Sequence, residues 1–63
     1  MGKYQHYKGD FYEVLHEATH SETEELLVIY RSEEGRVFAR PKEMFYEDVE
    51  VEGKILPRFK KID

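Results

Sequence analysis

The chain contains no cysteine and no tryptophan. Without cysteine it can form neither a disulfide nor a thiolate metal site, so aromatic packing must compensate for its small size. The 63 residues include 5 tyrosines and 4 phenylalanines. Each such ring buries roughly 150 to 250 Å², and a chain of this length buries only about 60% of its unfolded surface. We therefore expect one small domain over residues 1–63 with an aromatic core.

Long apolar runs and a positive net charge are also absent. No run approaches the roughly 20 apolar residues that cross a bilayer, and the first residues lack the apolar centre of a signal peptide. These absences predict a cytoplasmic protein without a membrane partner. The net charge of −4 opposes non-specific binding to nucleic acid. Basic residues near the two ends would still form a patch if the termini met: Lys3, Lys8, Arg58, Lys60 and Lys61.

Strand-like runs separated by turn residues occupy most of the chain. Leu26 to Tyr30 is an unbroken run of β-forming residues, which is typical of a central strand covered on both faces. Gly35, within Ser32 to Arg36, can adopt a positive φ and close a hairpin. Val37 to Arg40 then returns as the partner strand. Together with Tyr4 to Lys8, these runs indicate an antiparallel β fold.

The C-terminal third predicts a second hairpin. Glu47 to Val51 alternates polar and apolar residues, as a half-buried strand does. Glu52-Gly53 has the spacing of a two-residue turn that requires left-handed backbone. Lys54 to Phe59 follows as one strand, which Pro57 restricts to a sheet edge because proline has no N–H to donate. Residues 60–63 are expected to fray.

Two stretches join these strands. Phe11 to His20 fits a helix capped by Asp10, with its apolar residues on one face, and it also fits an edge strand. Local pattern slightly favours the helix, whereas the flanking strands favour a strand. Pro41 fixes its own φ, so we expect a strand ending at Arg40 and then a single helical turn over 41–45. In that turn Met44 and Phe45 would plug a small closed barrel.

Several blocks along the chain carry a resemblance to a known family. They are HYKG at His6 to Gly9, YEVL at Tyr12 to Leu15, HSET at His20 to Thr23, RPKEMF at Arg40 to Phe45, and VEGK with PRF between Val51 and Phe59. In this order they resemble the bacterial family called domain of unknown function 1653, over nearly the whole chain. Two features depart from it: the turn at Ser32 to Arg36 looks shorter, and Phe38 stands where Trp is expected.

The resemblance implies a small β-rich, SH3-like module with no established activity. It favours a strand for Phe11 to His20, and SH3-like folds place a one-turn 3₁₀ helix ahead of a late strand. We therefore expect an all-β fold. Its predicted form is a small SH3-like β-barrel of roughly five to six short antiparallel strands, with a one-turn 3₁₀ helix near 41–45.

No motif specifies a reaction. His16 to His20 spells HEATH, which matches the zinc-protease pattern H-E-x-x-H. That pattern works only on a helix, because on a strand the two imidazoles would lie roughly 13 Å apart. Ser21 and Ser32 have no nucleophile-elbow context, and the glycines are dispersed rather than grouped in a phosphate loop. We expect no metal, no cofactor and no catalytic residue.

The candidate ligand-binding residues are polar and aromatic side chains near predicted strand ends: His6, Tyr7, Lys8, His20, Phe38, Arg40 and Arg58. The two arginines can grip an anionic group bidentately while an aromatic ring stacks on a planar part of the ligand. In the structural alternative, the histidines bond to the backbone of turns and Arg40 pairs with a glutamate. We expect a non-catalytic binding module for a partner protein or a small anionic ligand.

Two other functions remain open. A nucleic-acid accessory module would use the terminal basic residues and exposed aromatic rings, although the net charge disfavours it. An enzyme acting on a nucleotide-like substrate ranks third. The predicted edge at Lys54 to Phe59 permits a monomer or a weak homodimer, since Pro57 and the flanking lysines protect that edge.

Overall fold

Residues 2–63, which the computed structural model describes, form seven strands and one short helix. The strands are β1 (Gly2–His6), β2 (Phe11–Thr19), β3 (Leu26–Ser32), β4 (Val37–Pro41), β5 (Asp48–Val51), β6 (Lys54–Pro57) and β7 (Phe59–Lys61), and the helix is α1 (Lys42–Phe45). The predicted all-β fold is confirmed. No helix in this part of the chain is long and apolar enough to span a bilayer.

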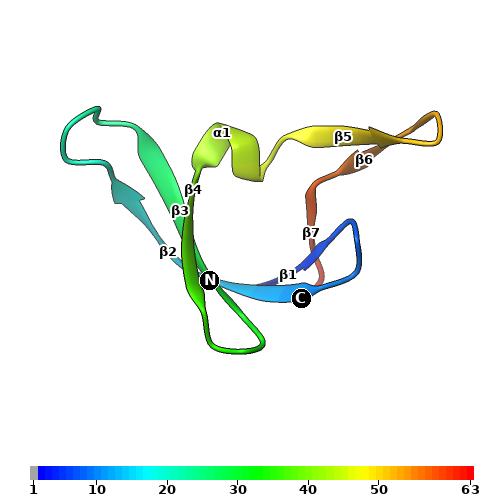
Figure 1. Ribbon diagram of the computed structural model, residues 1–63, viewed down its shortest axis with the longest axis horizontal. Coiled ribbons are helices and arrows are strands. Elements are labelled where there is room, and N and C mark those ends of the chain that lie inside the picture. The colour runs from blue at the N-terminus through cyan, green and yellow to red at the C-terminus, as the bar shows by residue number, and fades with distance from the viewer. Residues whose placement is uncertain (1) are drawn as a thin grey trace.

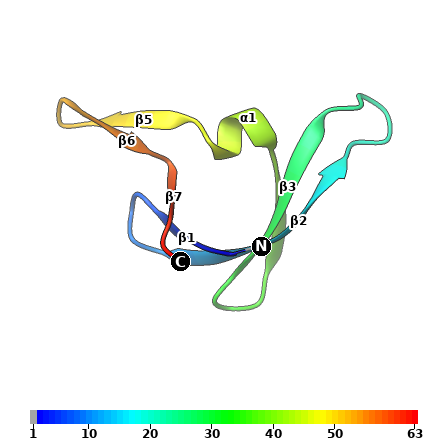
Figure 2. The ribbon, with the colours of Figure 1, turned by 180° about the vertical axis from the view of Figure 1, so that it is seen from behind.

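The strands form two antiparallel sheets. Five of them pair in the order β4-β3-β2-β1-β7, while β5 and β6 pair with each other. Figure 1 shows the larger sheet curving below α1, with the β5-β6 hairpin extending to one side, and Figure 2 shows the same arrangement from behind. β4 and β7 are the two ends of this order and do not pair with each other within the described residues, so the sheet is open. The predicted SH3-like barrel is therefore not confirmed.

The ambiguous segment is a strand. β2 covers Phe11–Thr19 and pairs with β1 on one side and with β3 on the other. The register shifts between Val14 and His16, which marks a β-bulge. A bulge adds one residue to a strand, so the apolar neighbours Val14 and Leu15 break the two-residue alternation there. This interruption is why the local pattern also fits a helix.

The two hairpin turns match the sequence prediction. β3 and β4 are joined by a turn in which Gly35 has φ 91°. β5 and β6 are joined by Glu52 (φ 51°) and Gly53 (φ 81°), and two consecutive positive φ angles define the type I′ turn that suits a two-residue hairpin.

The C-terminal segment differs from the prediction. Lys54 to Phe59 is divided between β6 and β7, which belong to different sheets. Pro57 has no N–H, and the Arg58 N–H bonds to the Glu47 carbonyl oxygen at 2.9 Å, so the chain changes direction there. Phe59–Lys61 pairs with β1, and bonding continues to residue 62. The prediction that residues 60–63 fray is therefore wrong, and the strand count is higher than predicted.

The turn after β4 also needs correction. α1 is one turn of α-helix rather than 3₁₀ helix, since the Tyr46 N–H bonds to the carbonyl oxygen of Lys42, four residues earlier, at 3.2 Å. Phe45 is fully buried, as predicted, but Met44 is 46% exposed and does not enter the core. β3 is likewise fully covered on one face only, because Val28 and Tyr30 are buried whereas Leu27 and Ile29, on the opposite face, are only partly buried.

The core lies between α1 and one face of the larger sheet, which we call the inner face. Its buried members come from β2, β3, α1 and β7: Val14, Val28, Tyr30, Phe45 and Phe59. The rings of Phe45 and Phe59 stack with centroids 4.1 Å apart and planes 4° apart. Tyr30 meets both rings edge-on at 5.3 and 5.4 Å. These stacked and edge-on contacts are favourable aromatic geometries, so three rings hold α1 on the sheet.

Candidate functional site

Most of the predicted binding residues meet on the inner face. Successive residues of a strand point to opposite faces, so Phe38 and Arg40 of β4 share a face, and Phe38 lies opposite Tyr30 in the sheet. His6 at the end of β1 lies opposite Phe59 of β7. The Phe38 ring stacks on Tyr30 at 5.5 Å, and the His6 ring meets Phe59 edge-on at 5.0 Å.

Arg40 is held by aromatic side chains. Its Nε donates a hydrogen bond to the Tyr30 hydroxyl at 3.3 Å, and its guanidinium carbon lies 5.8 Å from the centre of the Phe59 ring. A cation at this distance is attracted by the ring face. The ion pairs found among residues 2–63 do not include Arg40. The charge of Arg40 is therefore positioned but not neutralised by a carboxylate of this part of the chain.

Arg58 also acts on this region, and one of its nitrogens already pairs with a carboxylate. Its Nη2 donates to the Glu47 carboxylate at 3.1 Å, and its side chain is 22% exposed. Its Nε is buried and has no hydrogen-bond partner among the described residues. A buried N–H without a partner costs free energy, so this nitrogen is a locally unfavourable feature of the fold.

The charges of both arginines affect the pKa of His6. Burial lowers its pKa from 6.5, and the charges of Arg40, Arg58 and Lys8 lower it further, with Asp10 acting in the opposite direction. Its Nδ1 accepts the Lys8 N–H at 3.1 Å, so the neutral ring carries its proton on Nε2. His6, Arg40 and Arg58, which we call the Arg40 cluster, thus combine a region of positive potential with a further N–H donor.

Tyr7 and Lys8 flank this cluster at the turn after β1. The Tyr7 ring packs against His6 at 4.6 Å, and the Lys8 ammonium lies 5.9 Å from the Tyr7 ring centre. His6 and Tyr7 also line a small groove of about 200 Å³. Its other walls come from β1, β6 and β7: Gln5, Leu56, Pro57 and Lys60. This groove is the concavity next to the Arg40 cluster.

Sequence reasoning missed Arg36. Its guanidinium carbon lies 5.1 Å from the centre of the Phe38 ring, and Phe38 also stacks on Tyr30. The sequence contained a signal for this contact. Alternate residues of a strand share a face, and Arg36, Phe38 and Arg40 are two residues apart. Phe38 is therefore engaged with an arginine and a tyrosine of its own chain.

His20 lies apart from the other candidates. It follows β2 at the end opposite to the β1-β2 turn, so the 9 residues of β2 separate it from His6, which precedes that turn. Its Nδ1 accepts the N–H groups of Glu22 and Thr23 at 3.1 and 3.3 Å. This is the pattern of a side chain that closes its own turn.

The HEATH segment does not have the geometry of a zinc site. His16 lies within β2, and His20 lies in the turn after that strand, so the two are not on one helical face. Among the described residues no group of three or more His, Cys, Asp or Glu side chains is placed to hold a metal ion.

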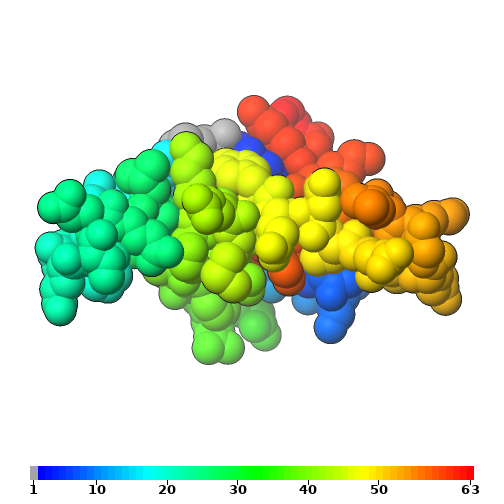
Figure 3. Space-filling model, turned by 90° about the horizontal axis from the view of Figure 1, so that it is seen from above, coloured from blue at the N-terminus to red at the C-terminus, as the bar shows by residue number. Residues whose placement is uncertain are grey.

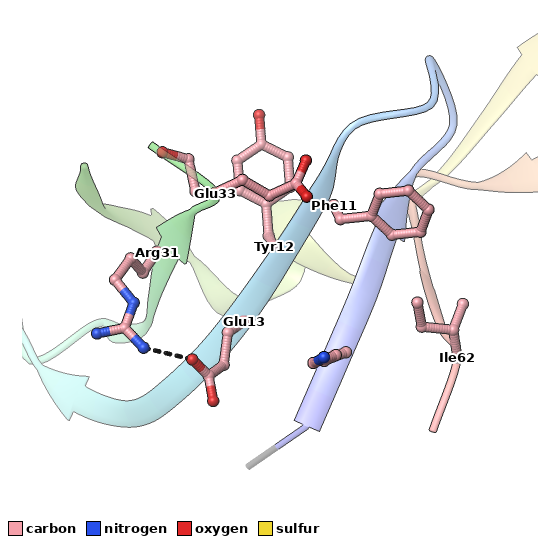
Figure 4. A pocket seen from close by; sticks show the side chains of 8 residues that line it. Phe11, Tyr12, Glu13, Arg31, Glu33 and Ile62 are labelled. Atoms are coloured by element: carbon pink, nitrogen blue, oxygen red, sulfur yellow. Dashed lines mark hydrogen bonds and ion pairs between the residues drawn. The ribbon is translucent and has the colours of Figure 1, made fainter. Parts of the chain in front are cut away.

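The outer face of the sheet carries a different groove, shown in Figure 4, with a volume of about 430 Å³. Phe11 and Ile62 form its apolar wall, and Figure 4 shows the Glu13 and Arg31 side chains pointing toward each other. These two form an ion pair, with about half of each side chain exposed. None of the predicted binding residues lines this groove. The charges within it largely cancel, so it is a weaker candidate for an anion.

Comparisons with known proteins agree with the resemblance seen in the sequence. Residues 2–61 match the family described as Protein of unknown function (DUF1653). A crystal structure of a protein of that family from Bordetella bronchiseptica is similar, with a TM-score of 0.89 and 34% sequence identity over 97% of this chain and 83% of that chain. No curated protein matches. The chain thus belongs to the DUF1653 family.

Proposed function

We propose that the protein is a non-catalytic binding module that holds an oxyanion at the Arg40 cluster. The observation that carries this proposal is the state of Arg40: a guanidinium fixed by Tyr30 and Phe59, placed beside His6 and Arg58, and free of ion pairs within the described residues. A fixed, uncompensated guanidinium favours an anionic partner, because the chain has already met the entropic cost of ordering it.

The donors present suit a carboxylate, phosphate or sulfate group. The Arg40 Nε is engaged by Tyr30, which leaves its two terminal nitrogens for a bidentate contact. His6 can add a hydrogen bond from Nε2, whereas the buried Nε of Arg58 is closed to a ligand, so Arg58 contributes its positive charge. Such an oxyanion could belong to a partner protein or to a small ligand.

A titration with inorganic sulfate, followed by nuclear magnetic resonance, tests the proposal. Chloride keeps the ionic strength constant. A bound oxyanion offsets the charges of Arg40 and Arg58, so the pKa of His6 should rise. Arg40→Lys keeps the charge but loses the planar guanidinium that can bind bidentately, and it should weaken sulfate binding about tenfold. Arg31→Lys, on the outer face, is the matched control and should bind as the native protein does.

Two results would overturn the proposal. One is a His6 pKa that sulfate does not move. The other is equal weakening by Arg40→Lys and Arg31→Lys, which would indicate general charge screening. A second arm uses a capped peptide with one phosphoserine. Binding of this peptide that is tighter than sulfate by more than about tenfold would point to a protein partner, whereas equal affinities would point to a small ligand.

A nucleic-acid accessory role is the second candidate. Arg36 over Phe38 and Arg40 over Phe59 are arginine–ring pairs of the kind that can meet stacked bases. However, Phe59 is only 4% exposed, so this ring offers no face to a base. A salt series with single-stranded RNA separates the two functions, because phosphate contacts predict a steep loss of affinity with salt. A monomeric or weakly dimeric protein in the cytoplasm stays a prediction.

A further inference from the structure

A third groove lies near α1, where β3 begins and β4 ends. It has a volume of about 520 Å³ and is lined by residues from the start of β3, the end of β4 and α1: Glu25, Leu26, Pro41, Lys42, Glu43 and Tyr46. Leu27 and Pro41 are paired in the sheet, which brings the start of β3 beside the end of β4. Figure 3 shows the segment around 22–27 next to α1 on this surface. None of the residues in the Arg40 cluster lines this groove.

The apolar side chains of this groove are exposed, and its aromatic ring is held by contacts with two other rings. Leu26 is 48% exposed and Tyr46 is 44% exposed. The Tyr46 ring meets Phe45 edge-on at 5.0 Å and Tyr4 at 6.3 Å. Burial, followed by a side-chain hydrogen bond with Tyr4, raises the pKa of Tyr46 to about 12, so its hydroxyl stays neutral. The groove therefore presents a fixed aromatic ring beside an aliphatic wall.

The charged residues of this groove are unbalanced. Lys42 is its only cation, and the Lys42 ammonium pairs at 3.2 Å with Glu17, which does not line the groove. Glu25 and Glu43 take part in none of the ion pairs found in residues 2–63. The groove is thus apolar with an acidic rim, opposite in sign to the Arg40 cluster.

We propose that this groove binds an arginine or lysine side chain from a basic segment of a partner protein. The aliphatic stem of such a side chain can lie on Leu26 and Pro41, since long cationic side chains bury their stems along apolar surface. Its charged head can then reach the two free carboxylates and the face of Tyr46. Charge complementarity selects this occupant over an acidic or purely apolar segment. This site does not depend on the proposed oxyanion site.

The probe is a capped peptide, Gly-Arg-Leu-Arg-Gly, titrated into the isotopically labelled protein and followed by amide resonances. The same peptide with both arginines replaced by glutamate is the negative probe. We expect shifts centred on Leu26, Glu43 and Tyr46, and no response to the glutamate peptide. The double variant Glu25→Gln/Glu43→Gln should weaken binding about tenfold, as loss of charge-assisted contacts does.

The matched control is Glu33→Gln/Glu34→Gln, in the β3-β4 turn, which changes the net charge by the same amount. It should bind the peptide as the native protein does. Tyr46→Phe keeps the ring and should retain binding, whereas Tyr46→Leu should weaken it; the amide spectrum of each variant shows that it is folded. Equal weakening by both glutamine pairs, or shifts spread over all acidic residues, would overturn the proposal. So would shifts at Leu26 and Tyr46 that depend on the protein's own concentration, because a second copy would then occupy the groove.

Discussion

Replacing Phe45 with alanine tests whether the aromatic core holds the fold together. Phe45 is fully buried, stacks on Phe59 at 4.1 Å and meets Tyr4 and Tyr30 edge-on. Truncation of such a phenylalanine costs about 3 to 5 kcal/mol. A domain of 63 residues is stable by roughly 3 to 9 kcal/mol, at about 0.05 to 0.15 kcal/mol per residue. We therefore expect Phe45→Ala to lose most of its free energy of unfolding.

Urea unfolding followed by near-ultraviolet circular dichroism measures this loss. Phe45→Leu leaves a smaller gap and should lose about 1 to 2 kcal/mol, so it remains measurable if the alanine variant is unfolded. Met44→Ala is the matched control, because Met44 is the neighbour in α1 and is 46% exposed; it should change stability by less than about 0.5 kcal/mol. A loss below about 1 kcal/mol for Phe45→Ala, or equal losses for Phe45→Ala and Met44→Ala, would refute the reasoning.

Three further changes probe the electrostatics and one turn. Burial and then the Arg40 charge lower the pKa of His6 from 6.5, so below that pH the unfolded chain binds more protons than the folded one. The free energy of unfolding should fall as the pH falls from about 6.5 through the folded pKa, and His6→Gln should flatten this slope in urea titrations; an unchanged slope would contradict the assignment. Gly53 has φ 81° and open space around its Cα. Gly53→Ala should therefore lower the free energy of unfolding by about 1 kcal/mol through backbone strain alone, and Gly53→Asn should lower it by much less. Equal losses for the two variants would show that strain is not the cause. Arg31→Ala breaks an ion pair with Glu13 whose side chains are about half exposed, so the loss should stay below about 1 kcal/mol and shrink at high salt; a larger, salt-independent loss would mean that Arg31 contributes by packing.

The turns and hairpins were predictable because their signals are local. Gly35 and Glu52-Gly53 are residues of the kind that short hairpin loops favour, and all three have positive φ angles. The strand over Phe11–Thr19 was harder, since the bulge after Val14 disrupts the alternation that identifies a strand. The split of Lys54 to Phe59 was not predictable, because it depends on a hydrogen bond from the Arg58 N–H to the carbonyl oxygen of Glu47, a distant residue in the loop before β5.

The candidate site, too, was predictable only where its signals are local. The spacing of Phe38 and Arg40 places both on one face of β4, and this follows from sequence alone. That His6 lies opposite Phe59, and so close to Arg40, depends on the pairing of β1 with β7. No local pattern links the two ends of the chain in this register. His20 could not be separated from the cluster for the same reason, since its distance depends on the length and direction of β2.

The Arg40 cluster and the core share aromatic rings, which links binding to folding. Tyr30 and Phe59 hold Arg40 from one side and pack on Phe45 from the other. If the folded state alone binds the oxyanion, sulfate at about 100 times its dissociation constant should add about 2.7 kcal/mol to the free energy of unfolding. Phe45→Leu should then regain its lost stability in sulfate. Sulfate also stabilises proteins in general, so the decisive comparison is Phe45→Leu with and without Arg40→Lys. A gain in the free energy of unfolding that persists in the double variant is a general salt effect. A gain that disappears in the double variant is due to binding at Arg40.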